Sequence, residues 1–274
     1  MIIKFIIFAL ASVVHFVYHI LSASYDEYYR MKDELYKDQR ERIEKFKFNE
    51  EVSRVFDDMI RRSVPGYIEN ILMCSDIIYE IYTGKGILYD LGCSTGALPI
   101  ALSEKFKETA FQYSGIDNSK AMVDKAQNNI EKFSDDYKDH HKIEFVTGDI
   151  REIDFNNAAI FIASYTLQFV PPGEREKLVK KLYCQLPPGG AFIMSEKVLE
   201  NGKLPTELFK KMHYLQKRDQ GYSDIEISQK REAIEKVLVP FTVENNLKML
   251  EETGFSSASI FLKKYNFASF IAIK

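Results

Sequence analysis

From residue 86 to the end, the chain alternates between two kinds of hydrophobic pattern. Short apolar runs, which are typical of buried strands, are followed by stretches in which apolar residues recur every three or four positions, as on one face of a helix. This alternation predicts an α/β fold with a mostly parallel sheet and helices on both of its faces. We expect seven strands, the last of them antiparallel, at residues 87–91, 112–116, 143–147, 158–164, 191–195, 257–262 and 267–273.

Two helices are expected before the sheet begins. After Asn49, which suits an N-cap, apolar residues recur at helical steps until Pro65, and a second apolar helix covers residues 67–82. Residues 31–47 are dense in charge, so we expect a solvated helix or arm there. The chain therefore divides into a hydrophobic extension 1–30, an N-terminal helical region 31–85 and an α/β domain 86–274.

The segment YDLGCSTG, residues 89–96, joins the first strand to a helix through a glycine turn. Strand, glycine turn and helix form the first unit of a nucleotide-binding α/β fold. Ser94 and Ala97 stand where the dinucleotide fingerprint requires glycines. The D-x-G-x-S-x-G pattern resembles instead the S-adenosyl-L-methionine (SAM) loop of class I methyltransferase folds, with Ser94 in place of the usual middle glycine. A glycine turn that binds no ligand is the structural alternative.

Polar residues stand at the ends of the next three strands. Asp117 ends the second strand, where this fold hydrogen-bonds ribose hydroxyls, and Asn118 or Ser119 suits the cap of the helix that follows. Asp149 follows the third strand and is either a partner for the exocyclic amine of adenine or a simple turn residue. Ser164 ends the fourth strand and opens on the cleft expected at the topological switch point.

A helical insertion, residues 199–241, separates the fifth strand from the helix that opens at Thr242. Insertions of this length after the carboxyl end of a strand usually cover or complete a site. The sequence from Ser223 to Glu226 is a capping box, so a helix is expected to start there.

Arg231 falls within the apolar stripe that Ile227, Ile234 and Leu238 form on this helix. An arginine that points with the apolar face needs an anion; it either snorkels or pairs with a structural carboxylate, or it binds a ligand. Beside the sulfonium of SAM, a guanidinium would be repelled by up to about 4 kcal/mol at ~4 Å and an effective dielectric of about 20. Arg231 therefore indicates a ligand whose sulfonium carbon bears a carboxylate.

Composition limits the function classes. The 274 residues are 46% hydrophobic with a formal net charge of -3, and no run of Lys and Arg is broken by aromatics, so direct nucleic-acid binding has little support. Cys74, Cys93 and Cys184 are far apart, which favours neither a zinc site nor a disulfide framework. His140 and His141 lie in a polar loop, and no third ligand supports a metal site, so no metal is expected.

The first 30 residues allow three interpretations. Residues 2–21 carry only Lys4 as a formal charge and are long enough to cross a bilayer. The same stretch could be a signal peptide. It could also lie upstream of a true start at Met31, and we favour this interpretation because the domain that follows needs cytosolic metabolites. A cytoplasmic protein is therefore expected.

Taken in order, the motifs closely resemble one family, the carboxy-S-adenosyl-L-methionine synthases, enzymes of bacterial wobble-uridine modification. The resemblance covers residues 48–274 and is most specific in the insertion, which ordinary methyltransferases lack. It rests on FNEEVSRVFDDMIRRSVPGY, YDLGCSTGA, IDNSKAM, GDIR, YTLQF, PPGG, SEK, GYSDIEISQKR and NFASFIAIK.

The resemblance implies a Rossmann-like class I methyltransferase fold and a transferase that makes carboxy-SAM from SAM and prephenate, releasing phenylpyruvate and water. The family commonly has asparagine where Ser164 stands, so the hydrogen bond made there is in question. The ligand-binding residues implied by the family are Tyr67, Gly92, Cys93, Ser94, Asp117, Asn118, Asp149, Ile150 and Arg231.

In this chemistry, aromatisation of prephenate drives the release of carbon dioxide, which a sulfonium-stabilised carbanion captures in a dry pocket. Arg231 would pair with the new carboxylate, and because prephenate is a dianion, we expect Arg62 to assist it. No base for the methyl proton is evident, and the leaving hydroxyl of prephenate is the reasonable candidate.

The family also implies a homodimer, which could meet through the insertion, and no direct contact with tRNA. The carboxylated product would pass to a separate tRNA carboxymethyltransferase. Two alternatives remain: an ordinary SAM-dependent methyltransferase acting on a small molecule or RNA, and a non-catalytic binder of an adenosyl ligand.

Overall fold

The computed structural model describes residues 31–133 and 141–274. The predictions made for residues 1–30 and for His140 lie outside this described part. Within it, no helix combines the length and the apolar character needed to cross a bilayer.

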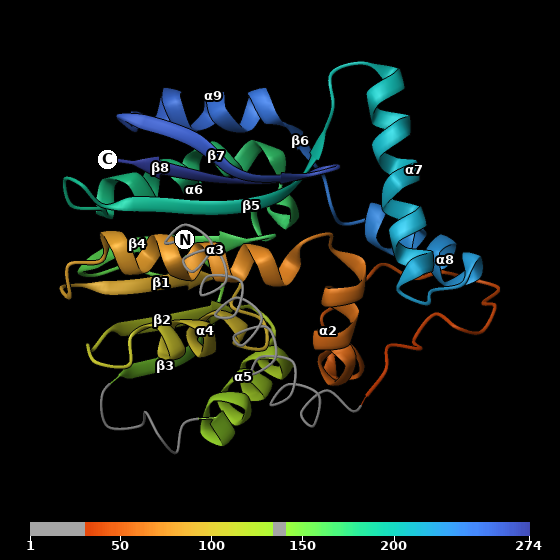
Figure 1. The fold of residues 1–274 in the computed structure, drawn as a ribbon, viewed down its shortest axis with the longest axis horizontal. Coiled ribbons are helices and arrows are strands. Elements are labelled where there is room, and N and C mark those ends of the chain that lie inside the picture. Colours follow the sequence, from red (N-terminus) through yellow and green to blue (C-terminus); the bar gives the residue numbers. More distant parts are fainter. Residues whose placement is uncertain (1–30, 134–140) are drawn as a thin grey trace, which may run out of the picture.

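One twisted sheet runs through the molecule (Figure 1). Its order is β3-β2-β1-β4-β5-β8-β7, and only β8 runs antiparallel to its neighbours, as the sequence predicts. A two-residue strand, β6 (Phe241–Thr242), extends the pairing of β5. The seven main strands are β1 (Ile87–Leu91), β2 (Gln112–Asp117), β3 (Lys142–Thr147), β4 (Ala158–Ser164), β5 (Ala191–Leu199), β7 (Ser257–Lys264) and β8 (Phe267–Ile273).

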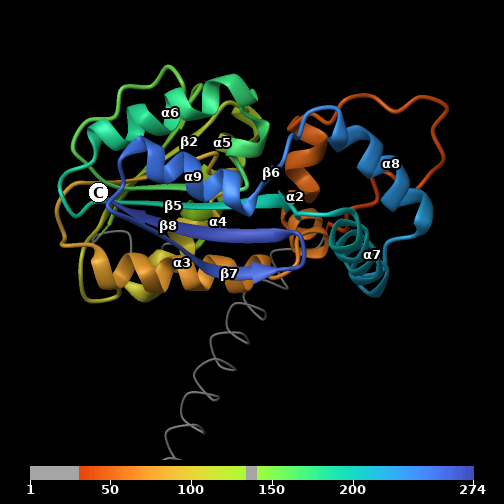
Figure 2. The same cartoon turned by 90° about the horizontal axis from the view of Figure 1, so that it is seen from above.

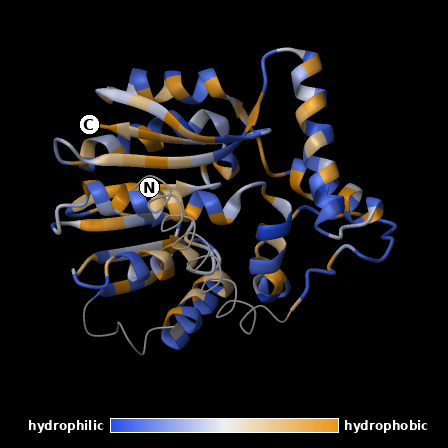
Figure 3. Cartoon of the chain, in the orientation of Figure 1, coloured by the Kyte–Doolittle hydropathy of each residue, from blue (hydrophilic) through white to orange (hydrophobic). Residues whose placement is uncertain are grey.

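Helices cover both faces of the sheet (Figure 2). Because successive side chains of a strand point to opposite faces, Leu88 of β1 packs with α3 (Tyr67–Ile81) and α4 (Ala97–Lys105), whereas Tyr89 packs with the side of α6 (Pro172–Gln185) and α9 (Val243–Thr253). The helix α5 (Lys120–Phe133) lies beside α4. Apolar residues accordingly concentrate in the strands and on the helix sides that face them (Figure 3).

The carboxyl ends of the parallel strands are covered by a separate helical layer. It consists of α2 (Glu50–Ser63), α7 (Lys203–Asp219) and α8 (Asp224–Glu235), with residues 31–49 running around its outer side (Figures 1 and 2). The predicted N-cap Asn49 and the predicted capping box before α8 are both present. The sequence patterns did not single out α7.

Residues 31–49, which we call the arm, contain no helix and bind along α8. The Gln229 side chain donates hydrogen bonds to the carbonyl oxygens of Tyr36 and Asp38 at 2.9 and 2.8 Å. The backbone N–H of Phe46 donates to the carbonyl oxygen of Ala233 at 3.2 Å. The arm thereby covers one flank of α8 and buries the residues on that flank.

Candidate active site

A cavity of about 490 Å³ lies where the strands end and the helical layer begins. Its lining comes from the loops after β1, β2, β3 and β4, from the arm, and from α2, α7 and α8. Nine of the residues predicted to bind the ligand line it: Tyr67, Gly92, Cys93, Ser94, Asp117, Asn118, Asp149, Ile150 and Ser164. The sequence therefore located one end of this cavity correctly, while the binding roles of these residues stay predictions.

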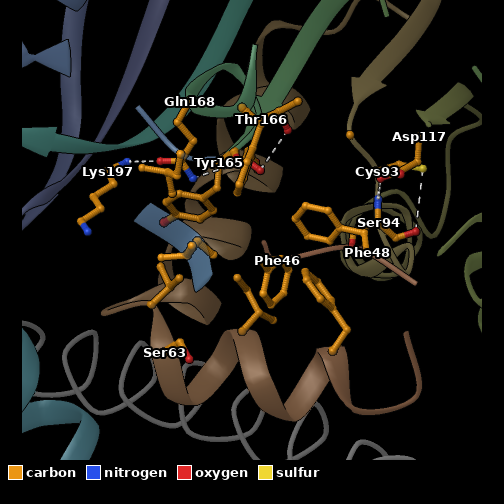
Figure 4. A pocket seen from close by; sticks show the side chains of 18 of the residues that line it. Phe46, Phe48, Ser63, Cys93, Ser94, Asp117, Tyr165, Thr166, Gln168 and Lys197 are labelled. Atoms are coloured by element: carbon orange, nitrogen blue, oxygen red, sulfur yellow. Dashed lines mark hydrogen bonds between the residues drawn. The ribbon is translucent and has the colours of Figure 1, made fainter. Parts of the chain in front are cut away.

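The glycine turn is tight for a steric reason. Gly92 has φ +80°, and a Cβ atom there would lie 2.8 Å from Cγ2 of Thr166, so only glycine fits. Ser94 occupies the left-handed region with φ +53°, where a side chain is strained. Its backbone N–H donates to Oδ2 of Asp117 at 3.1 Å, which holds the turn against the end of β2 (Figure 4).

Asp117 has a fixed orientation. Its second oxygen, Oδ1, accepts from the backbone N–H of Ser119 at 2.9 Å, while Ser119 Oγ caps α5 by accepting from the N–H of Met122 at 3.3 Å. The cap is therefore Ser119, one of the two residues predicted. Burial raises the pKa of Asp117, and the two backbone donors oppose this shift. Carboxylate oxygens have further lone pairs, so the side chain can still accept from ribose hydroxyls.

Asp149 stands at the loop after β3. It pairs with Arg151 at 2.5 Å, which lowers the pKa of the Asp149 carboxyl, and Arg151 also pairs with Glu174. The carboxylate is thus held ionised beside the cavity, and its oxygens can accept from an amine. Ile150, the next residue, is buried and contributes apolar lining.

Asp90 is a lining residue that the sequence analysis did not select, although it is the first residue of the D-x-G-x-S-x-G pattern. Its side chain is buried, and Oδ2 accepts from the Tyr113 hydroxyl at 2.6 Å. Its Oδ1 is buried and has no partner within the described residues. Desolvation raises the pKa of Asp90 to about 7. A buried acceptor of this kind suits a cationic ligand such as SAM, which carries an ammonium and a sulfonium.

The opposite end of the cavity is lined by basic side chains. They are Lys197 of β5, His213 and Lys217 of α7 and Lys230 of α8. Lys230 Nζ donates to Asp33 Oδ2 at 3.0 Å, to Ser63 Oγ at 2.8 Å and to the Tyr222 hydroxyl at 3.2 Å.

His213 is fixed in one tautomer. Its Nε2 lies 2.8 Å from the carbonyl oxygen of Ser63, and because a carbonyl only accepts, Nε2 carries the proton. Burial lowers the pKa of His213 to about 3, so the ring is neutral at physiological pH.

The lysine ammoniums of this end are destabilised by burial and by one another. Burial, together with repulsion from Lys230 and Lys197, lowers the pKa of Lys217 to about 7, while Asp33 opposes the shift. The pKa of Lys230 falls to about 8 for the same main reason, despite its ion pair with Asp33. Desolvation also lowers the pKa of Lys197. Groups with such perturbed pKa values in a cavity are candidates for ligand binding.

Aromatic side chains separate the two ends. Phe46 and Phe48 of the arm project toward the middle of the cavity, and Tyr165 stands beside Gln168 and Lys197 on the side away from Ser94 (Figure 4). Tyr165 has φ +61°, and Gln168 Nε2 donates to its carbonyl oxygen at 3.1 Å, which fixes this strained residue.

The inward placement predicted for Arg231 is wrong. Arg231 does not line the cavity; its side chain is 39% exposed, and Nη1 lies 3.4 Å from the Tyr214 hydroxyl of α7. The preceding residue, Lys230, lines the cavity instead. Lys230 lies between Ala233, on the flank that the arm covers, and Ile234, which lines the cavity, whereas Arg231 lies at the other edge of the apolar stripe, beside Tyr214 of α7.

Arg62, predicted to assist catalysis, does not line the cavity either. Its Nε donates to the carbonyl oxygen of Gln220 at 2.8 Å and its Nη1 to Asp58 Oδ2 at 2.9 Å. The guanidinium also stacks 3.9 Å from the ring centroid of Tyr222. The side chain is buried and joins α2 to the loop between α7 and α8, which is a structural role.

Potential metal ligands do not gather in the described residues. No group of three or more His, Cys, Asp or Glu side chains with suitable spacing occurs between residues 31 and 133 or between 141 and 274. His141 stacks on Phe111, with 4.2 Å between the ring centroids.

The chain is similar to known proteins over almost its whole length. The family described as Methyltransferase domain matches residues 88–190. The carboxy-S-adenosyl-L-methionine synthase of Sulfurimonas denitrificans is 46% identical over 230 residues, which cover 84% of this chain and 94% of that protein. The enzymes of the same name from Nautilia profundicola and Campylobacter lari are 42% and 40% identical over 85% and 89% of this chain and 96% and 100% of their own.

Solved structures support the fold. Human N-acetylserotonin methyltransferase in complex with SAM superimposes with a TM-score of 0.54 at 17% identity, covering 82% of this chain and 55% of that chain. Magnesium protoporphyrin IX methyltransferase from Synechocystis with bound SAM gives a TM-score of 0.52 at 14% identity, covering 93% of each chain. The predicted Rossmann-like class I methyltransferase fold is confirmed.

Proposed function

Because the chain belongs to the carboxy-S-adenosyl-L-methionine synthase family, we propose that it is a transferase that converts SAM and prephenate to carboxy-SAM, phenylpyruvate and water. The observation that carries this proposal is a cavity with acidic groups at one end and basic groups at the other. Acidic groups suit a sulfonium nucleotide, and basic groups suit an anionic second substrate.

At the acidic end, three carboxylates would divide the recognition of SAM. Asp117 would accept from the ribose hydroxyls, Asp149 from the adenine amine, and Asp90 would face positive charge in the amino-acid part. The Gly92 turn would let the nucleotide approach the backbone, because it carries no side chain there.

The aromatic middle of the cavity would keep the reacting groups dry. Loss of the ring carboxyl and hydroxyl makes prephenate aromatic, the SAM methyl group loses one proton, and its carbon forms a bond to the released carbon dioxide. The proton and the departing hydroxide combine to water, so the reaction balances without a further reactant. Phe46 and Phe48 would protect the carbanion and the carbon dioxide from solvent.

The proposed physiological role follows the family resemblance. Carboxy-SAM would serve a separate tRNA carboxymethyltransferase at the wobble uridine, in the cytoplasm, and this chain would not contact tRNA itself. We also propose a homodimer that meets through the insertion. Leu204 and Leu208 on α7 are 80% and 49% exposed, which supports an interface there. In sedimentation, we expect the wild type to behave as a dimer. The double variant Leu204→Glu, Leu208→Glu should behave as a monomer.

Mass spectrometry tests the reaction. The purified chain is incubated with SAM and prephenate, and the nucleotide fraction is analysed for a species heavier than SAM by one carbon dioxide. We expect this heavier species to form only when both substrates are present. A methylated acceptor formed without prephenate would instead identify an ordinary methyltransferase.

A further inference from the structure

The basic end of the cavity carries more positive charge than its protein neighbours neutralise. Lys230 has Asp33 as an ion-pair partner at 3.0 Å. Among the residues described, neither Lys197 nor Lys217 has a carboxylate within 4 Å; Glu235 acts on Lys197, and Asp33 on Lys217, only from longer range. Two ammoniums therefore lack an ion-pair partner among the described residues.

These ammoniums have little access to water that could offset the imbalance. Lys217 is 8% exposed and Lys230 6%, and Lys197 is partly buried. An isolated buried ammonium is unfavourable and usually persists only with a partner or a function. A structural role alone would leave the repulsion between these lysines unexplained, since among the described residues only Lys230 has a carboxylate within 4 Å.

The shape next to the ammoniums indicates the class of the missing partner. Phe267 lines the cavity and packs edge-to-face against His213 at 5.1 Å and against Tyr165 at 6.0 Å between ring centroids. This aromatic wall suits a flat or cyclic apolar body. A ring that bears two carboxylates matches both the wall and the charge.

We propose that Lys197 and Lys217 bind the two carboxylates of a cyclic dicarboxylate substrate, against the wall formed by Tyr165 and Phe267. The inference rests on the proposed function, because it assigns the subsite for the second substrate of that reaction. Lys230 acts as a positioning residue, since its ammonium is already held by Asp33, Ser63 and Tyr222 and lies beside Lys217.

Steady-state kinetics and calorimetry with the full chain test this subsite. We expect Lys217→Met and Lys197→Met each to raise the KM for prephenate by about 10- to 100-fold, because each removes one charge-assisted contact. The affinity for SAM, measured by isothermal titration calorimetry, should stay unchanged. Lys217→Arg should restore a large part of the prephenate affinity, because it restores the charge.

A matched control is available on the same helix. Lys211 of α7 is exposed and does not line the cavity, so Lys211→Met should leave the KM for prephenate unchanged. If Lys217→Met and Lys197→Met both keep the KM within about twofold of the wild type, the subsite is elsewhere and the inference is overturned.

Direct binding separates this inference from the proposed function. If the wild type makes no carboxylated nucleotide, the proposed function fails, and calorimetric titration with prephenate alone then decides the subsite. Binding that Lys217→Met and Lys197→Met abolish would support it, and absence of binding would overturn it. If product forms but the variants behave as wild type, the function stands and the subsite fails.

Discussion

The two ends of the cavity differ in charge and in origin. The acidic end is made by loops that directly follow parallel strands, and Gly92, Asp117 and Asp149 are its main features. The basic end is assembled from β5, α7, α8 and the arm, and its ion pair joins residues 197 positions apart in the chain. The difference shows that the loops after the parallel strands form one end of the cavity, while β5, the insertion and the arm form the other end, where we propose that the second, anionic substrate binds.

The largest expected effect is the loss of SAM binding at the acidic end of the cavity. Gly92→Ala places a Cβ against Thr166 and forces the turn to move, so we expect product formation to fall by at least about 100-fold through lost SAM binding. Mass-spectrometric quantification of the product measures this. Gly84→Ala is the control: it has a similar φ of +77°, yet no atom lies within 4 Å of the added carbon. Equal losses in both variants would contradict the steric argument.

Asp117→Ala should show whether the two ends of the cavity bind their ligands independently. The loss of the carboxylate should weaken SAM binding by about 10- to 100-fold, because ribose hydroxyls lose a charged acceptor. The affinity for prephenate should change little, which is the reverse of the pattern expected for Lys217→Met. Calorimetric titration with each substrate provides the comparison. A parallel loss of both affinities would show that the ends do not act independently.

Prephenate binding should weaken as pH rises. The pKa of Lys217 is about 7 and that of Lys230 about 8, so both ammoniums are charged below pH 7 and lose their protons above it. The groups that face Lys217 are Lys230, Lys197, Asp33 and His213, and His213 stays neutral in this range because its pKa is about 3. The KM for prephenate should therefore be flat below pH 7 and rise above it.

The same profile for Lys217→Met provides the check on this pH dependence. Its KM should start higher and rise less, because one of the titrating ammoniums is gone. A wild-type KM that is constant from pH 7 to pH 9 would contradict the assignment.

Lys217→Met should also increase the free energy of unfolding, by about 1 kcal/mol, because it removes a buried charge that has no ion-pair partner among the described residues. The pKa of Lys217 is about 7 in the folded chain against 10.5 unfolded. The unfolded state therefore binds the proton more strongly, and the charge destabilises the fold most below pH 7. The difference in the free energy of unfolding between the variant and the wild type should become smaller as the pH rises from 7 towards 10.5. Urea unfolding at several pH values measures it, and a less stable variant would contradict it.

The smallest effect is expected for Ser94→Gly. Glycine relieves the strain of the left-handed backbone but gains freedom in the unfolded chain, so the free energy of unfolding should change by less than about 1 kcal/mol. SAM affinity should be retained, because the backbone N–H that binds Asp117 remains. Thermal unfolding and calorimetry measure the two quantities. A large loss of affinity would assign the Ser94 hydroxyl a direct role.

Much of the fold could be predicted because its signals are local. The strands, the glycine turn at Gly92 and the caps at Asn49 and Ser223 each depend on a few neighbouring residues. The position of the acidic end could be predicted from the strands and the glycine turn, since parallel strands bring their carboxyl ends to the same edge of the sheet. Asp90 was missed even though it lies in the quoted motif, because its unpaired oxygen is apparent only once Tyr113 is in place.

The sequence by itself determined the sheet, the family and the nucleotide end of the cavity. Tertiary structure decided which of two adjacent basic residues lines the cavity. Lys230 and Arg231 are about 100° apart on α8, and the apolar stripe alone favoured Arg231. The arm packs against Gln229 and Ala233, and Lys230 lies buried between this covered flank and Ile234, which lines the cavity. The residue pattern of α8 alone cannot predict that Lys230 is buried, because its burial depends on the arm, which lies almost 200 residues away in the chain.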